Sequence, residues 1–574
     1  MKIKYIILSV VMGSLFSCVQ YEDVPLEDRT IDVIFSETDS IGKQAEKWLT
    51  GLYSILEKRH NGVSGDYLGA ATDDAISSSN NETDVQKLAL GQYTSMSIVE
   101  SEMNFVYWYK GIRRSNIFIE NILRVPLMDE FEGIPMNVIW QNEARFLRAY
   151  SYFELIKRYG GVPLLRGHVI ELGEDMAYPR DSFETCVDFI IAELDEIENE
   201  LRTPNVLSAK PYAVTAGAVA ALRVRVLLYA ASPLFNNQEN TNPLLGYTNY
   251  DAGRWKLAVD AVDYFTNTYG YYGLYEASGD STDFTQTFIV SYEQGNPEDI
   301  FHMQIGDGTN KEVEVNNGPV GFSAPNVASG RTSPSQNLAE AFPMRDGKAI
   351  GESSYSYDFN NQYVNRDPRF YGTLLYQDAM WLTENLQLYM GGKSNPNGSG
   401  QKTKTGYYMR KFMGDYANED RYSEDYTHNW MIFRYAEILL NYAEALNEFS
   451  GPSNEVYNAL ISIRRRAGIE EGDGYYGLKA NMTKDEMREA IHNERRIEMA
   501  FEEQRYWDLR RWKKAETVLN QSIEGLIIVK NGPSVSYTKT TVLQPSFEEK
   551  SYYYPFPYTE TLKNPNLFQN PGWE

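Results

Sequence analysis

Apolar residues recur every three or four positions through the first half of the chain, a spacing that places them on one face of a helix. Asp181 and Glu184 stand three residues apart before one apolar run, which predicts a capping box at the start of a helix. The segment 212–231 is apolar nearly all round, so its helix should be buried between neighbours. The pattern predicts helices over residues 41–58, 105–124, 137–159, 212–231 and 254–269.

The chain changes character between about residues 270 and 428 and then returns to helical spacing. The middle segment is rich in Gly, Asn, Ser, Pro and Tyr and carries short alternating pieces such as DIFHMQIG, which predicts long loops with small strands. Helical spacing resumes in residues 430–449 and 453–467. Thr483 and Glu486 predict a second capping box, followed by one long helix through residue 513.

The N-terminal residues are typical of a secretory leader. Lys2 and Lys4 precede about a dozen mostly apolar residues, a run shorter than the roughly 20 needed to span a bilayer. The run ends in LFSC, which resembles the lipobox of bacterial lipoproteins and makes Cys18 the expected site of acylation and membrane anchoring. The alternative is an ordinary leader in which Cys18 has no special role. The other cysteine, Cys186, is expected to be a buried, inert thiol.

The expected fold is mostly α-helical, with tetratricopeptide-like helix pairs forming a curved frame and a loop-rich half with few strands. Small residues at the expected crossing points favour such pairs, although the chain shows no regular 34-residue repeat. We divide the chain into a leader (1–17), a tether (18–40), an N-terminal helical part (41–270) and a loop-rich and C-terminal helical part (271–574). The last two parts are expected to form one globular unit.

Charge and aromatic content narrow the function. The formal net charge is −25, which disfavours contact with phosphate backbones and hence with nucleic acids. Aromatic residues make up 13% of the chain and include 43 tyrosines. Apolar rings with polar tips suit surfaces that contact hydroxylated ligands or other proteins, although most of these rings are expected to pack between helices.

Six stretches of the chain resemble signature sequences of SusD/RagB-like proteins, which are nutrient-binding lipoproteins of the Bacteroidetes outer membrane. They are RFLRAYSYFELIKRYGGVPLL (145–165), LAEAFPMRDGK (338–348), NRDPRFYGTLLY (365–376), FRYAEILLNYAEALNE (433–448), NERRIEMAFEEQRYWDLRRW (493–512) and YPFPYTETLKNPNLFQNPGW (554–573). Together with the lipobox, these stretches follow the family's order and extend the resemblance over essentially the whole chain.

The resemblance implies a protein anchored through acylated Cys18 on the outer face of the outer membrane. Such proteins bind oligosaccharides and deliver them to a SusC-like TonB-dependent transporter, and they are not enzymes. A binder of peptides or glycoproteins on the same fold is the main alternative. A surface glycoside hydrolase is less expected because nothing marks two carboxylates on facing loops. A tetratricopeptide scaffold without sugar affinity is the remaining alternative.

A sugar-binding site needs aromatic platforms with polar groups around them, and two regions supply candidates. These are the loop that follows the first helix and the irregular middle segment. Loop capping is the alternative role for Asp73 and Asp74, and packing is the alternative for Tyr93. The candidate ligand-binding residues are Tyr67, Asp73, Asp74, Asn81, Tyr93, Tyr272, Tyr275, Tyr292, Phe322, Arg331 and Trp381.

No cofactor or metal site is expected. The middle segment lacks the alternating acids and central glycine of an EF-hand loop, and the five histidines show no spacing suited to zinc. A structural calcium ion bound by acids from scattered positions stays an alternative.

Acids and arginines stand three or four residues apart in the predicted C-terminal helix. They predict a buried or half-buried charge lattice that locks this helix to a loop, whereas a catalytic carboxylate pair would need residues on facing loops. The residues concerned are Glu494, Arg495, Arg496, Glu498, Glu502, Arg505 and Asp508.

Overall fold

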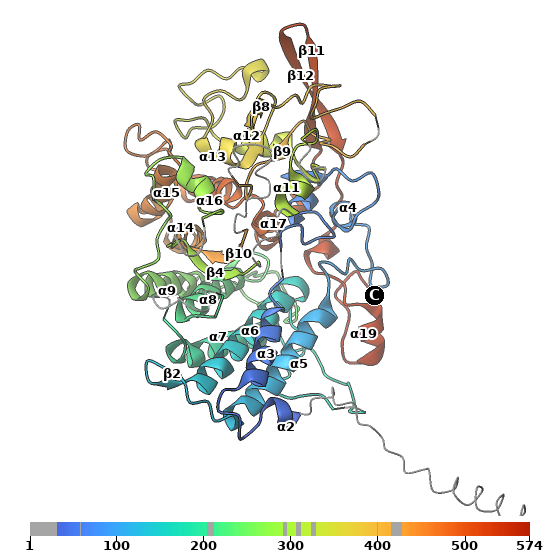
Figure 1. Ribbon diagram of the computed structural model, residues 1–574, viewed down its shortest axis with the longest axis vertical. Helices are drawn as coiled ribbons and strands as arrows, with labels where there is room; N and C mark the ends of the chain where they lie inside the picture. The colour runs from blue at the N-terminus through green and yellow to red at the C-terminus, as the bar shows by residue number, and fades with distance from the viewer. Residues whose placement is uncertain are drawn as a thin grey trace, which may run out of the picture.

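Long helices form one side of the molecule, and loops with short strands form the other (Figure 1). The computed structural model describes residues 31–57, 59–171, 173–203, 212–290, 295–305, 312–322, 329–398, 400–414 and 428–574. The leader, the predicted acylation site Cys18 and the candidate Tyr292 lie outside these residues.

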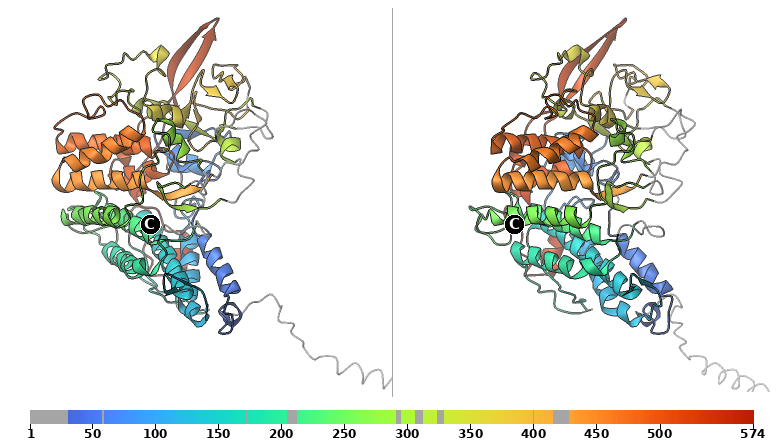
Figure 2. Two further views of the ribbon diagram at one scale, coloured as in Figure 1. Left: turned by 60° about the vertical axis from the view of Figure 1, so that its left-hand side comes forward. Right: turned by 90° about the vertical axis from the view of Figure 1, so that its left-hand side faces the viewer.

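The helical side is a stack in which successive helices pack on one another. Each helix from α5 to α8 packs against the next one, and α9 packs against α14, although the loop-rich segment separates these two in sequence. Figure 2 shows α14 to α16 (orange) lying above α8 and α9 (green). The long elements are α3 (Lys43–Tyr53), α5 (Phe105–Asn121), α6 (Met136–Tyr159), α7 (Phe183–Ile197), α8 (Ala216–Ala231), α9 (Gly253–Thr268), α14 (Tyr435–Ser450), α15 (Asn454–Arg466), α16 (Lys484–Glu498) and α17 (Gln504–Arg511). The predicted, mostly helical fold is confirmed.

The strands of the described residues form two-stranded antiparallel sheets. The longest pair projects from the loop-rich side as a hairpin (Figure 1). The pairs are β1 (Ala75–Ser77) with β5 (Thr332–Pro334), β2 (Glu130–Phe131) with β3 (Ile134–Pro135), β4 (Asp299–Met303) with β10 (Trp430–Arg434), β6 (Leu374–Leu375) with β9 (Tyr408–Met409), β7 (Met380–Trp381) with β8 (Glu384–Asn385), and β11 (Ile523–Asn531) with β12 (Ser534–Leu543).

Short helical elements connect these strands and the long helices. The short α-helices are α2 (Ile31–Ile34), α4 (Asp84–Ala89), α10 (Thr282–Gln286), α11 (Glu312–Asn317), α12 (Gln336–Ala341), α13 (Pro368–Thr373), α18 (Ala515–Val518) and α19 (Tyr558–Lys563). The single 3₁₀ turns are η1 (Leu68–Ala71), η2 (Ile122–Arg124), η3 (Glu198–Glu200), η6 (Phe359–Asn361) and η8 (Glu549–Tyr552).

Local sequence signals account for several helix ends. α6 ends at Gly160, whose φ of +74° suits glycine, because a side chain is strained in this region. Thr483 and Glu486 form the predicted capping box of α16. α8 is buried along nearly its whole length, as its continuous apolar pattern predicted. The predicted box at Asp181 is wrong, because Ser182 caps α7 by accepting a hydrogen bond from the backbone N–H of Thr185.

Two helices are shorter than predicted. Residues 430–434 form strand β10, which pairs with β4, so the helix predicted over residues 430–449 begins only at Tyr435. The long helix predicted through residue 513 breaks after Glu498, and Phe501 and Glu503 adopt left-handed φ angles of 63° and 62°. After the break, Glu502 pairs with the buried cations Lys411 and Arg434.

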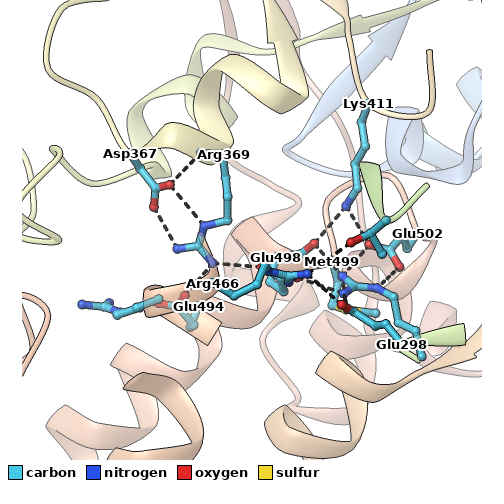
Figure 3. A network of polar contacts seen from close by, with 12 residues as sticks. Glu298, Asp367, Arg369, Lys411, Arg466, Glu494, Glu498, Met499 and Glu502 are labelled. Carbon is cyan, nitrogen blue, oxygen red and sulfur yellow. Dashed lines mark hydrogen bonds and ion pairs between the residues drawn. The ribbon is translucent and has the colours of Figure 1, made fainter. Parts of the chain in front are cut away.

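A network of buried ion pairs joins the helical side to the loop-rich side (Figure 3). Five acids face five cations, so the network is formally neutral although its side chains are almost fully enclosed. We call this set the Glu498 network; its members are Glu298, Asp367, Glu494, Glu498, Glu502, Arg369, Lys411, Arg434, Arg464 and Arg466.

Glu498 lies at the centre of this network and contacts three cations from three other elements. Its carboxylate accepts hydrogen bonds from Arg434 of β10 at 2.9 Å and from Arg369 of α13 at 3.1 Å, and it pairs with Arg466 of α15. Burial opposes ionisation of Glu498, but these cations outweigh burial and lower its pKa well below the usual range. The predicted charge lattice is therefore confirmed as buried, but the partners of Glu498 lie on other elements rather than one turn along its helix.

Removing the central carboxylate should destabilise the fold strongly. Glu498→Ala leaves buried cations without their partner, so we expect the free energy of unfolding to fall by about 3–5 kcal/mol. Glu489→Ala is the matched control, because Glu489 lies on the same helix and pairs with Lys514 at the surface. The control should change the free energy of unfolding by less than about 1 kcal/mol. Urea unfolding followed by circular dichroism measures both, and equal effects would contradict the central role of Glu498.

Candidate functional site

Three segments that are far apart in sequence meet within the loop-rich side. The pairing of β1 with β5 places Ser77 opposite Thr332, and the backbone N–H of Ser78 donates to the carbonyl of Arg331 at 2.8 Å. The segment that contains Gln401 then contacts Ser78. We call this set the Arg331 cluster; its members are Ser64, Asp66, Ser77, Ser78, Ser79, Asn81, Arg331, Gln401 and Lys404.

Arg331 and Asp66 form the charged centre of the cluster. The Nε atom of Arg331 donates to Oδ2 of Asp66 at 3.0 Å, and its Nη2 atom donates to the carbonyl of Ser64 at 3.1 Å. Ser77 also donates to Oδ2 of Asp66, at 3.1 Å. The side chain of Arg331 is 21% exposed whereas that of Asp66 is enclosed. Arg331 therefore presents a fixed cation at the surface above a buried acid.

Hydroxyl and amide groups surround this centre. Gln401 donates to Oγ of Ser78 at 3.1 Å, and the ammonium group of Lys404 donates to the carbonyl of Ser79 at 2.7 Å. The backbone N–H of Asn81 donates to Oγ of Ser79 at 3.1 Å, and the Asn81 residue is exposed. Ser77, Ser78 and Ser79 are buried and hold the loops together. The groups open to a ligand are the amide and ammonium groups of Asn81, Gln401 and Lys404, which are of the kind that recognise hydroxylated ligands.

Burial changes the pKa values of two charged groups of the cluster, Asp66 and Lys404. Burial raises the pKa of Asp66 to about 6, although Arg331 opposes the shift. The Oδ1 atom of Asp66 is enclosed and has no hydrogen-bond partner among the described residues. Burial also lowers the pKa of Lys404, although Asp66 opposes that shift. Asp66 is therefore poised to change charge in mildly acidic solution.

The candidate acids Asp73 and Asp74 are buried and form ion pairs with arginines of the protein. Asp73 pairs with Arg496 at 2.8 Å and with Arg505 at 2.9 Å, and Asp74 pairs with Arg496 at 2.7 Å. Burial disfavours the charge on Asp73, but Arg496 and Arg505 outweigh burial and lower its pKa to about 2. Asp73 is thus held by α16 and α17, and Asp74 by α16. These ion pairs were not among the roles expected for the two acids.

The structure corrects the expectation of an exposed aromatic platform. For example, the ring of Tyr67 stacks on that of Phe412 with centroids 5.8 Å apart. A ring enclosed in the core has no face on which a sugar can stack, so we remove the buried rings from the candidate site. Five predicted rings are buried in this way: Tyr67, Tyr93, Tyr272, Phe322 and Trp381.

Tyr275 lies away from the cluster. It is half-buried, and its backbone N–H donates to Glu298 of the Glu498 network at 2.9 Å. Of the predicted site residues, Asn81 and Arg331 are the two that the structure brings together with exposed polar groups. A role in ligand binding stays a prediction for both.

Sequence reasoning missed most of the cluster. Asp66, Gln401 and Lys404 were not among the candidates, although Gln401 and Lys404 follow the polar run GGKSNPNGSG that marked a loop. Such a run indicates a surface loop. It does not indicate that this loop contacts Ser78 and Ser79, more than 300 residues earlier in the chain.

Two family models match the chain and together cover most of it. The SusD family model matches residues 297–573, and a model described as starch-binding associating with outer membrane matches residues 32–228. The chain belongs to the SusD-like family, as its signature sequences predicted.

Individual relatives show the same likeness over nearly their whole length. SusD-like protein P38 of Formosa agariphila is 24% identical, over 99% of this chain and 98% of its own. A crystal structure of a SusD-like protein from Bacteroides fragilis has 25% identity and a TM-score of 0.75, covering 94% of this chain and 98% of its own. A solved laminarin-binding SusD-like protein has 20% identity and a TM-score of 0.63, covering 92% of this chain and 99% of its own.

In the part of the chain that the structure describes, no helix combines the length and apolar character required to cross a membrane. Among the same residues, no group of three or more His, Cys, Asp or Glu side chains is arranged to hold a metal ion.

The raised pKa of Asp66 predicts a pH-dependent contribution to stability. Between about pH 4 and pH 6 the unfolded chain releases this proton while the folded chain retains it, so the wild-type protein loses stability as the pH rises. Asp66→Asn removes this loss. Its free energy of unfolding relative to wild type should therefore increase from pH 4 to pH 6 and then level off. Denaturant unfolding across this range measures the difference.

Asp473→Asn, which replaces an exposed loop acid, serves as the control for removing one carboxyl group. A stability difference for Asp66→Asn that stays constant from pH 4 to pH 6 would contradict the assignment.

Proposed function

We propose that this protein binds oligosaccharides at the cell surface and delivers them to a SusC-like TonB-dependent transporter. The observation that carries the proposal is the Arg331 cluster, in which loops from three parts of the chain bring together guanidinium, amide and ammonium groups that are at least partly exposed. They belong to Arg331, Asn81, Gln401 and Lys404. Membership in a family with a starch-binding model supports a glycan as ligand, as does the overall likeness to a laminarin-binding protein.

The chemistry of the cluster suits sugars because their hydroxyl groups both donate and accept hydrogen bonds. Arg331 and Gln401 offer donors, and the side-chain amide of Asn81 offers both donor and acceptor. Bonds to a charged group contribute about 1.5–3 kcal/mol each, more than bonds between neutral groups, so the two cations Arg331 and Lys404 should contribute most of the binding energy within the cluster.

We infer that the protein is tethered to the outer membrane by acyl chains on Cys18. The lipobox-like sequence LFSC and the family description of outer-membrane association support this location. Association with the transporter would place bound ligand at the mouth of its barrel, and no cofactor is needed for such a role. Co-purification of a transporter with the protein from solubilised outer membranes tests the partnership.

We further infer that the protein binds glycans without cleaving them. Glycosidases need two carboxyl groups on opposite sides of the scissile bond. The carboxyl group of Asp66 is paired with Arg331, and that of Asp84, beside the cluster, accepts a hydrogen bond from Ser64 at 2.5 Å, so side chains of the protein itself contact both. Incubation with polysaccharides should release no new reducing ends, and their appearance would overturn this inference.

Replacing Arg331 should weaken glycan binding by about tenfold or more. The expected tenfold loss of affinity follows from the loss of a charged hydrogen-bond donor. Affinity electrophoresis against laminarin, starch and other polysaccharides identifies a ligand, and calorimetry then compares Arg331→Ala with wild type. Asn81→Ala, at an exposed position, should weaken binding severalfold without disturbing the buried acid.

Arg345→Ala is the matched control, because Arg345 is exposed, pairs with Glu470 and lies outside the cluster. Full glycan affinity in both Arg331→Ala and Asn81→Ala would show that the ligand binds elsewhere. Binding of oligopeptides but of no glycan would favour the alternative of a peptide carrier.

A further inference from the structure

A pocket with apolar and aromatic walls lies between α5, the stretches 163–171 and 173–178, and the C-terminal segment that contains α19. Its volume is about 280 Å³. The two helices lie on the lower right of Figure 1, away from the loop-rich side. The pocket shares no residue with the Arg331 cluster.

Hydrogen bonds between the surrounding segments hold this pocket open. The rings of Phe105 and Tyr109 form its floor on α5, with centroids 4.7 Å apart. The hydroxyl group of Tyr109 donates to the carbonyl of Pro163 at 2.6 Å. Asn564, from the C-terminal segment, donates to the carbonyl of Tyr178 at 2.7 Å. Each wall is thus tied to another segment, so the pocket is preformed rather than assembled by its ligand.

The charge of the lining is opposite to that of the chain. Lys110 and Arg113 are exposed, lie three residues apart on α5 and form no ion pair among the described residues. Lys563 and Glu560 also line the pocket and neutralise each other at 2.7 Å. The lining therefore carries three cations and one acid, a formal charge of +2, on a chain whose net charge is −25.

We propose that this pocket binds a small amphipathic carboxylate. The apolar body of the ligand, alkyl or aromatic, fills the cavity, and its carboxylate group contacts Lys110 and Arg113 at the mouth. Nine of the fourteen lining residues are apolar or aromatic, which suits such a body. The volume is close to the lower end of ligand pockets, at about 300 Å³, and therefore favours a compact molecule.

Calorimetric titration with octanoate and with 2-naphthoate tests the proposal and distinguishes an alkyl from an aromatic ligand. The full chain carries Cys18→Ser so that no acyl chain competes. Wild-type protein should bind at least one of the two carboxylates with one-to-one stoichiometry. It should bind the corresponding neutral alcohol at least threefold more weakly, because the cations at the mouth favour a negative charge.

Two kinds of variant test separately how the cavity and the cations at its mouth contribute to binding. Val106→Trp places an indole in the cavity and should abolish binding. Lys110→Gln combined with Arg113→Gln alters only exposed side chains and should weaken carboxylate binding about threefold to tenfold while leaving alcohol binding unchanged. Lys47→Gln, which replaces an exposed lysine of α3, is the control and should bind as wild type does.

Three results would overturn the proposal. The first is that neither carboxylate binds at millimolar concentration. This holds also if substitutions in the pocket weaken association with a membrane partner, because the pocket would then be a protein contact and not a ligand site. The second is unchanged binding in Val106→Trp. The third is equal affinity for carboxylate and alcohol in the wild-type protein.

Discussion

Charge neutralisation inside the Glu498 network is the interaction on which the rest of the structure depends. Its five acids and five cations come from helices, strands and loops on both sides of the molecule. A buried charge without a partner costs several kcal/mol, so each element must supply its partner at the correct place. The network therefore specifies how the loop-rich side sits on the helical stack, beyond what apolar burial alone would specify.

The helix that carries Glu498 also positions the candidate site. Arg496, two residues before Glu498, pairs with Asp73 and Asp74 immediately before β1. β1 in turn pairs with β5 and so places Ser77 and Ser78 beside Arg331. A chain of ionic and backbone contacts thus connects the core to the exposed cluster, which explains how long loops can hold polar side chains in fixed positions. Fixed donors bind a ligand with less loss of conformational entropy than mobile ones.

The sequence predicted the helical side well and the site poorly, for one physical reason. Helical spacing, the cap at Thr483 and the glycine at Gly160 are local signals, and each was confirmed. The break after Glu498 was missed because no glycine or proline marks it in residues 499–503. The β11–β12 hairpin was missed although Gly532 stands first in its two-residue turn, with a φ of +60° that suits glycine. Five predicted rings of the site are buried, because residue type alone does not distinguish a ring in the core from one at the surface.

Hydrogen–deuterium exchange with a bound oligosaccharide tests the central claim most directly, because it locates the ligand without any substitution. The account predicts slower exchange in residues 61–81, 329–335 and 400–404 when the ligand is present, and unchanged exchange in α8 and α9. Protection confined to other segments, or none in these three at saturating ligand, would contradict it.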